Sequence, residues 1–343
     1  MGELHNAARL AIAAILAAVL APIGALTAKA ADPWVTFQGQ QGPGLGKHVV
    51  FVTGDEEYRS EESMPQLAKI LAVRHGFHCT VLFAINKNDG TIDPQTVDNI
   101  PGLAALDTAD LMVIFTRFRE LPDDQMKHIV DYVNSGKPIL GLRTATHAFR
   151  YVKHKDSPYA KYSWDQRPDG GFGRQVLGET WINHYGHHQH ESTRGLIAEG
   201  RAADPIVRGV DDIWGPSDVY AVTALSGDSK PLVMGQVLVG MHPQDPPNKE
   251  KHLVPVAWTK TFTGTAGKPA RVFATTMGHG GDLQSEGFRR LLINACYWCL
   301  GMEDRIGGRS QAELVGKYDP NPIGTAKHKK GLKPADYQLA APQ

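Results

Sequence analysis

Cysteine is scarce in this chain, since its 343 residues contain only Cys79, Cys296 and Cys299. Three thiols do not make the disulfide framework on which small secreted folds depend, so a hydrophobic core must hold this fold. Cys296 and Cys299 have the spacing of a redox pair, but they fall late in a predicted helix, whereas reactive pairs use a helix N-terminus to lower a thiol pKa. We therefore expect all three to pack in the core.

An excess of charge of either sign is also missing. Lys plus Arg and Asp plus Glu each number 36, so the formal net charge is zero when histidine is neutral. This balance argues against a nucleic-acid partner and against a polybasic membrane anchor. After residue 30 no stretch is apolar enough to span a membrane. The glycines between residues 170 and 173 match neither a dinucleotide fingerprint nor a phosphate loop.

The first 30 residues have the composition of a targeting segment. Arg9 precedes a short apolar run, 10–20, and small residues alternate at Ala28 and Ala30. This pattern is typical of a signal peptide cleaved after Ala30, with an uncleaved anchor as the alternative. It predicts a periplasmic or secreted protein.

The remainder divides into a polar N-terminal lead, 31–47, a large domain, 48–302, and a polar segment, 303–343, expected to form an extended C-terminal tail. The first part of the domain alternates between apolar runs and amphipathic stretches. Predicted strands are 48–53, 79–84, 109–116 and 138–142, and predicted helices are 60–75 and 122–135. Regular strand–helix alternation indicates an α/β fold with right-handed crossovers and a mainly parallel sheet. Farther along, strands are predicted at 219–225 and 231–239, expected to be antiparallel, and at 254–262 and 271–277, expected to pair around a turn at 264–268. A helix is predicted at 283–300.

Polar side chains follow the predicted strands where each one ends. These residues are Asp55, Glu56, Arg117, Arg119, Arg143, Thr144 and His147. Open parallel sheets bind ligands outside the carboxyl ends of their strands, so the pattern predicts one polar crevice. The simpler alternative is that these loops are charged because they face solvent.

The stretch from Pro138 to Phe149 passes from an apolar strand to a polar turn. In several α/β folds such a turn carries a Ser or Cys nucleophile. Here Arg143 takes that place, and a guanidinium only donates hydrogen bonds. If the turn continues as a helix, Arg143 and His147 share one face. We interpret the pair as acid/base machinery without a nucleophile; the alternative is an arginine that pairs with a carboxylate and a histidine that packs.

Histidines gather in the stretch 181–191, at His184, His187, His188 and His190. If this stretch is extended, His188 and His190 point the same way and could chelate a divalent metal such as Zn²⁺, the one cofactor that the sequence suggests. Alternatively, these histidines bind sugar hydroxyls, form salt bridges or include a general base.

A second candidate site lies in the glycine-rich turn that holds His279 and Asp282. It follows a predicted strand and precedes a helix, where exposed backbone amides favour anions.

Four stretches together resemble the ThuA-like (trehalose utilisation) family of the class I glutamine amidotransferase-like superfamily. They are VVFVTGDEEYRSEES at 49–63, DLMVIFTRFRELPD at 110–123, KPILGLRTATHAF at 137–149, and RVFATTMGHGGD with FRRLLINACYWCLG within 271–301. The segment 204–214 is similar as well. The resemblance implies a flavodoxin-like three-layer sandwich whose members generally lack the catalytic Cys. Many members carry His where Arg143 stands here, and His279 falls on the family's Gly-His motif.

The resemblance further implies a role in sugar catabolism, on substrates such as trehalose-related sugars or 3-keto-glycosides. We expect a hydrolase, lyase or isomerase with Arg143, His147, His184 and His279 as catalytic candidates. The expected substrate-binding residues are Asp55, Glu56, Arg117, Arg119, Thr144 and Asp282. A non-catalytic sugar-binding module and a metal-dependent hydrolase using the histidine cluster are the alternatives. The expected partner is a small carbohydrate, with no nucleic acid and no membrane after signal cleavage; self-association is left open.

Overall fold

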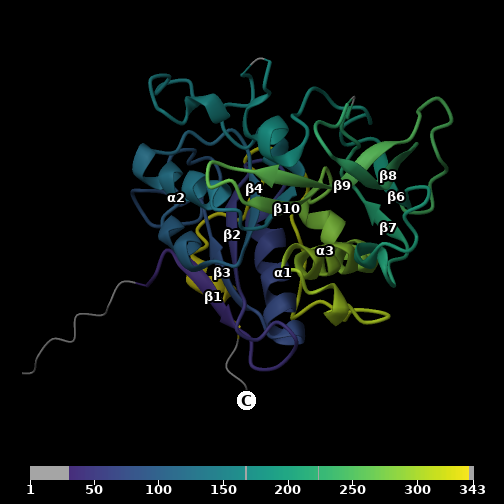
Figure 1. Cartoon of the computed structure of the whole chain (residues 1–343), viewed down its shortest axis with the longest axis horizontal. Helices are drawn as coiled ribbons and strands as arrows, with labels where there is room; N and C mark the ends of the chain where they lie inside the picture. Colours follow the sequence, from purple (N-terminus) through teal and green to yellow (C-terminus); the bar gives the residue numbers. More distant parts are fainter. Residues whose placement is uncertain (1–30, 167, 223, 340–343) are drawn as a thin grey trace, which may run out of the picture. The chain divides into compact units, whose positions relative to one another are not determined.

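The computed structural model describes residues 31–166, 168–222 and 224–339. The predicted signal peptide, 1–30, lies outside the described residues. The described chain forms one ten-stranded sheet with the order β1-β3-β2-β4-β5-β10-β9-β8-β6-β7 (Figure 1). None of its helices is long and apolar enough to cross a membrane.

One half of this sheet is parallel. Its strands, in spatial order, are β3 (His78–Leu82), β2 (His48–Gly54), β4 (Leu111–Thr116), β5 (Ile139–Leu142) and β10 (Pro269–Thr275). If these five strands are numbered by their order in the sequence, their order across the sheet is 2-1-3-4-5. The direction of the strand order therefore reverses between β2 and β4. A ligand site is expected beside such a reversal, outside the carboxyl ends of the strands.

The other half is antiparallel, so the prediction of a mainly parallel sheet was wrong. It consists of β9 (Val254–Thr263), β8 (Lys230–Leu238), β6 (Ser192–Ile197) and β7 (Ile213–Gly215), which continue outward from β10. At the opposite edge β1 (Trp34–Gln38) pairs antiparallel with β3. The regular strand–helix alternation ends near residue 149, and short connections such as the turn between β9 and β10 impose antiparallel pairing. Residues 219–225, predicted as a strand, make only an isolated bridge, between Tyr220 and His184.

Helices cover both faces of the parallel half. The helices α1 (Ser60–His75) and α3 (Glu286–Cys299) pack on one face, and α2 (Asp123–Asn134) packs on the other. Neighbouring residues of β4 point to opposite faces, so Val113 joins the first core and Met112 joins the second. All three cysteines are buried and free, as predicted.

The C-terminal segment follows the surface of the same domain. Between residues 303 and 339 it forms only the short turns η7 (Glu303–Arg305) and η8 (Pro334–Tyr337). The Tyr337 ring stacks on Phe83 with 5.6 Å between centroids. The Gly324 amide donates to the Glu57 carbonyl at 3.0 Å. This contact brings the segment back to the carboxyl end of β2.

Candidate functional site

The turn after β5 continues as a 3-10 helix, η2 (Arg143–His147), and opens with an unusual backbone conformation. Arg143 has a φ of 45°, in the left-handed region that bulky residues rarely adopt. Phe118, Gln189 and Arg59 share this property, with φ values of 50°, 61° and 64°. Strained residues persist where surrounding contacts hold them, and they often mark functional sites. Three of these four, Arg59, Phe118 and Arg143, lie in the turns that follow β2, β4 and β5.

Arg143 is fully buried, and its guanidinium donates hydrogen bonds to other residues of the protein. Its Nη1 donates to the carbonyl oxygens of Asp218 at 2.5 Å and Thr276 at 2.7 Å, and its Nη2 donates to Asp218 Oδ1 at 2.8 Å. The guanidinium lies 4.4 Å from the centroid of the Tyr58 ring and 3.7 Å from that of Tyr220. With an exposed fraction of 0%, it cannot contact a substrate directly, although it was a catalytic candidate. It positions Asp218 instead.

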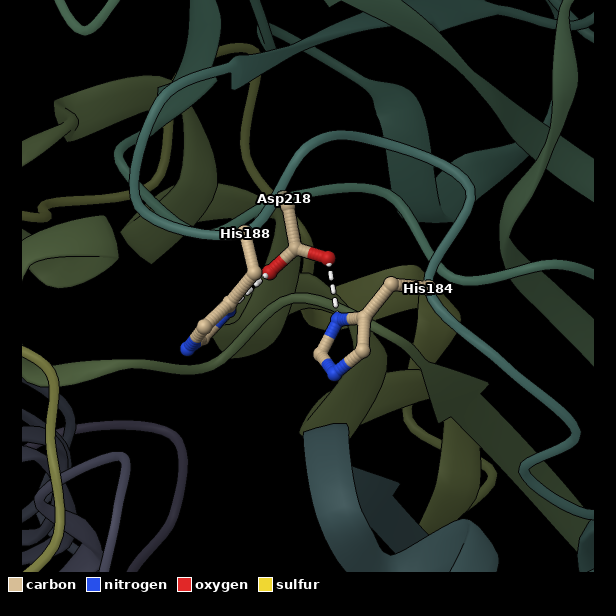
Figure 2. Close-up of side chains that lie close together, drawn as sticks. All are labelled: His184, His188 and Asp218. Atoms are coloured by element: carbon tan, nitrogen blue, oxygen red, sulfur yellow. Dashed lines mark hydrogen bonds and ion pairs between the residues drawn. The ribbon is translucent and has the colours of Figure 1, made fainter.

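Asp218 links two histidines (Figure 2). Its Oδ1 lies 2.9 Å from His188 Nδ1, and its Oδ2 lies 2.6 Å from His184 Nδ1. Burial alone would raise the pKa of this carboxyl, but the Arg143 charge and the two histidine hydrogen bonds hold the pKa far below its usual range. Asp218 is therefore ionised and can only accept hydrogen bonds. Both Nδ1 atoms must then carry protons.

The two histidines differ in the surroundings of Nε2. His188 Nε2 lies 3.2 Å from Glu57 Oε1, so this ring stands between two carboxylates. The hydrogen bond to Asp218 and the nearby Glu57 carboxylate outweigh burial and raise the pKa of His188 to about 9. His184 keeps 29% of its side chain exposed, and its Nε2 points away from Asp218 (Figure 2). In a neutral His184 ring that Nε2 carries the free lone pair, beside an imidazolium whose centroid is 4.7 Å away.

Glu57 and Arg117 border the two histidines at the carboxyl ends of β2 and β4. Arg117 Nη2 lies 3.1 Å from Glu57 Oε2, and Arg117 also pairs with Glu56. Burial opposes ionisation of Glu57, but His188 and Arg117 hold its pKa below the usual value. Of the expected substrate-binding residues, Glu56 and Arg117 are the two that remain partly exposed near the histidines.

A row of aromatic rings extends from His184. The Trp181 ring lies 5.8 Å from His184, Trp164 lies 5.5 Å from Trp181, and Phe118 lies 5.6 Å from Trp164, all measured between centroids. These three aromatic residues are half-buried.

Asp55 and Thr144, expected to bind substrate, are fully buried and hold the loop after β2. Asp55 Oδ1 accepts from the amides of Glu57 at 2.7 Å and Tyr58 at 2.6 Å, and its Oδ2 accepts from the Thr144 hydroxyl. These bonds fix the backbone that presents Glu57.

Arg119 and Asp282 are also closed to substrate. Arg119 pairs with Glu56 Oε2 at 2.6 Å and donates to backbone carbonyls. The oxygens of Asp282 accept from the amides of Gly278 and His279 and from Ser217. This carboxylate therefore occupies the turn amides that were expected to bind an anion.

The two remaining catalytic candidates lie away from the Asp218 carboxylate. His147 packs among rings, 5.0 Å from Phe118 and 5.2 Å from Trp181, and burial with the nearby Arg117 charge places its pKa well below the usual value. Its side chain is almost completely buried, which does not suit direct proton exchange with a substrate. His279 begins the turn η6 (Gly280–Gln284), where its Nδ1 accepts from the Gly281 amide at 2.9 Å.

The expected metal pair is not formed. His188 and His190 were expected to share one face of an extended stretch, but residues 188–190 form a turn and the His190 ring stacks on His187 at 4.3 Å. Instead, His184, His188 and Asp218 offer ligand atoms within 4.8 Å of one another. To hold a divalent ion such as Zn²⁺ through Nδ1, both rings would have to lose the proton that they share with Asp218.

Sequence reasoning missed Asp218, Glu57, Tyr58 and Tyr220. Of these four, Glu57 would have been the easiest to predict, because it directly follows Asp55 and Glu56 at a predicted strand end. Asp218 follows a three-residue strand in an otherwise irregular region, so no periodic pattern marks it. Its role depends on contacts with residues 30 and more positions away.

The fold and the cluster define an α/β protein with an Asp-linked histidine pair at the strand ends. The model of the ThuA family, described as trehalose utilisation, matches residues 48–299. The chain belongs to the ThuA family, which confirms the resemblance and places it broadly in trehalose utilisation.

Two crystal structures illustrate the similarity. A ThuA-like protein from Parabacteroides merdae ATCC 43184 is 15% identical, with a TM-score of 0.47 over 86% of this chain and 99% of that chain. One from Bacteroides uniformis ATCC 8492 is also 15% identical, with a TM-score of 0.44 over 76% of this chain and 93% of that chain. The search of curated proteins found no match.

Proposed function

We propose that the protein carries out acid–base chemistry on a small sugar at the His184–Asp218–His188 cluster. The observation that carries the proposal is the shared carboxylate, which gives its two histidines different tasks. Through Nδ1 it orients His184 and leaves Nε2 free as a general base. His188, between Asp218 and Glu57, supplies a fixed positive charge. Arg143 is a positioning residue for Asp218.

A 3-keto-glycoside suits these groups because its carbonyl acidifies the neighbouring carbon. His184 Nε2 would take the proton from that carbon while the electron pair moves onto the carbonyl oxygen. A cation close to the developing oxyanion stabilises it, and His188 can provide one. Collapse of the enolate would expel the glycosidic oxygen, which takes the proton back from His184; reprotonation on carbon instead would give an isomerase. Neither route needs a Ser or Cys nucleophile.

Two further observations support a carbohydrate substrate. The half-buried rings of Trp181, Trp164 and Phe118 offer flat apolar surfaces of the kind that pack against the C–H face of a sugar. The family itself is described as trehalose utilisation. The 2-1-3-4-5 order of the parallel strands supports a flavodoxin-like, amidotransferase-related core. From the sequence of residues 1–30 we also propose export to the periplasm or the medium.

Replacing the proposed base tests the function. His184→Gln is expected to lower kcat on a 3-keto-glycoside by about 10²–10⁴-fold with little change in KM, because general-base catalysis contributes that much. The matched control is His190→Gln, an exposed histidine from the same stretch, which should retain wild-type kinetics. Wild-type protein that binds the sugar by calorimetry but never turns it over would instead be a non-catalytic binding module.

The metal-dependent alternative has one observation in its favour, the convergence of His184, His188 and Asp218. Against it, the Arg143 Nη2 lies 2.8 Å from Asp218 Oδ1 and already compensates the carboxylate charge. Activity that disappears with EDTA and returns in proportion to added Zn²⁺ would establish this alternative. Activity that survives EDTA, in protein shown by elemental analysis to be free of stoichiometric metal, would support the acid–base proposal.

A further inference from the structure

A second cavity lies close to the histidine cluster, with His279 in its lining. Its volume is about 360 Å³, within the range of small-molecule sites. The Tyr58 ring borders both places, since its centroid lies 5.9 Å from that of His188 and 6.4 Å from that of His279. The His279 cavity is thus a neighbour of the proposed catalytic cluster, and none of the three cluster residues lines it.

One ring nitrogen of His279 is buried without a well-formed hydrogen bond to a described residue. Its Nδ1 accepts from the Gly281 amide, so the proton of the neutral ring is on Nε2. Burial, with the nearby charges of Arg143 and Arg59, lowers the pKa of His279 to about 3, so the ring is neutral. An interaction with the Asn321 backbone raises the pKa of His279 but does not offset this lowering. Nε2 nevertheless makes no hydrogen bond of good geometry to any described residue. A buried donor without a partner favours a ligand that brings an acceptor.

The described lining of the cavity carries one positive charge and no negative one. Besides His279, its polar side chains are the Lys327 ammonium and the amides of Gln189, Gln284 and Asn321, and no acidic residue is among the described residues of the lining. Met241, Ile323 and three prolines supply the apolar part. Because a lysine and a neutral imidazole N–H only donate, this lining suits an anionic oxygen ligand rather than a cation.

One wall of the cavity comes from outside the region that defines the family. Pro320 to Ile323 and Lys327 belong to the C-terminal segment, whereas the family match ends at residue 299. Asn321 anchors this wall, since its amide and side chain donate to the two Glu62 oxygens at 2.8 and 3.0 Å. The wall is therefore a fixed element and not a loosely placed loop.

We propose that the His279 cavity binds a small organic carboxylate, such as a sugar acid, with the carboxylate between His279 Nε2 and Lys327. The hydroxylated remainder of the ligand meets the amide side chains, and its carbon chain packs on the prolines and Met241. This site does not depend on turnover at His184. The protein would thus bind two different ligands: a neutral keto-sugar at the histidine cluster and a negatively charged carboxylate in the His279 cavity.

Isothermal titration calorimetry with gluconate tests the proposal, and sorbitol serves as the neutral polyol of the same carbon number. Gluconate is expected to bind wild-type protein at least about tenfold more tightly than sorbitol, because a charge-assisted hydrogen bond contributes roughly that factor. Lys327→Met should remove most of this difference. The matched control is Lys155→Met, an exposed lysine outside the lining, which should leave gluconate affinity unchanged.

His279→Asn tests the second contact. Asparagine is a good helix N-cap and keeps an acceptor for the Gly281 amide, but it lacks the Nε2–H donor. Gluconate affinity should fall about tenfold or more in this variant, while His184→Gln should bind gluconate as wild type does. Absence of gluconate binding to wild type, equal binding of sorbitol, or unchanged affinity in Lys327→Met would overturn the proposal. None of these outcomes depends on whether the protein turns over a keto-sugar.

Discussion

At the residue scale, the central feature is one ionised carboxylate inside the protein. Asp218 is buried, and its charge is compensated by Arg143 and by hydrogen bonds from His184 and His188. A buried charge that loses its partner is costly, so the arginine is required to keep the cluster in its ionised form. Arg143 occupies the place of a nucleophile in related turns, yet its effect on chemistry is indirect.

Removing this cation should destabilise the fold. Arg143→Met is expected to lower the free energy of unfolding by about 3–5 kcal/mol, because it leaves Asp218 buried without its main partner. Urea denaturation at neutral pH measures the change. Arg305→Met is the matched control; this arginine side chain is 62% exposed, so its loss should change stability by no more than about 0.5 kcal/mol. A loss below about 1 kcal/mol in Arg143→Met would contradict the role given to this ion pair.

The protonation of His188 predicts a pH dependence. Its folded pKa, about 9, is above the unfolded value near 6.5, so the proton binds more tightly in the folded state. The resulting stabilisation is complete below about pH 6.5 and is lost as the pH rises through about 9. The stability advantage of wild type over His188→Gln should therefore shrink between pH 7 and pH 10. Urea denaturation across that range is the measurement, and an advantage that grows with pH would refute the assignment.

The limits of sequence prediction are clear at this scale. Arg143 and the histidine-rich stretch could be selected because charged and titratable residues there interrupt apolar patterns. The partner of Arg143 could not be found, since Asp218 lies 75 residues farther along in an irregular segment. The pairing of His188 with His190 rested on an extended backbone, and a local turn brings His184 to His188 instead.

At the element scale, the strand ends carried most of the predictive information. The strands β2, β4 and β5 lie within about two residues of their predicted positions, and Glu56, Arg117 and Arg143 follow them. The position of each strand end was predictable because apolar runs are periodic and local. Which polar residues stay open to solvent was not, because that depends on contacts between distant parts of the chain, such as Thr144 with Asp55 and Asp218 with Arg143.

The C-terminal segment is an element whose anchoring can be tested. Asn321→Ala removes the side-chain hydrogen bond to Glu62 Oε1, and the bond to the backbone amide remains. We expect a loss of about 1 kcal/mol in unfolding free energy and a weaker affinity for gluconate, because the wall of the His279 cavity loosens. Chemical denaturation and calorimetry give the two values. Asn88→Ala, in an exposed loop, should change neither.

At the scale of the whole molecule, the two halves of the sheet have separate tasks. The parallel half supplies Glu57 and Arg143 from its strand ends. His184 and His188 precede β6, and Asp218 lies between β7 and β8 of the antiparallel half. The α/β class and the family could be recognised from the sequence of the first half and of α3. The pairing of β9 with β10 around a short turn was predictable too, whereas the addition of β6 and β7 to the same sheet was not, because these strands are short and lie in otherwise irregular sequence.

The burial of Arg143 also bears on the order in which the chain can mature. Its carbonyl acceptors, on Asp218 and Thr276, are made 75 and 133 residues after it. A nascent polypeptide that has passed β5 must keep this guanidinium hydrated until Asp218 and Thr276 have been synthesised. The strand-end cluster around Arg143 can thus close only after the segment that follows β10 has been made, and a product terminated before that point would leave the guanidinium without these acceptors.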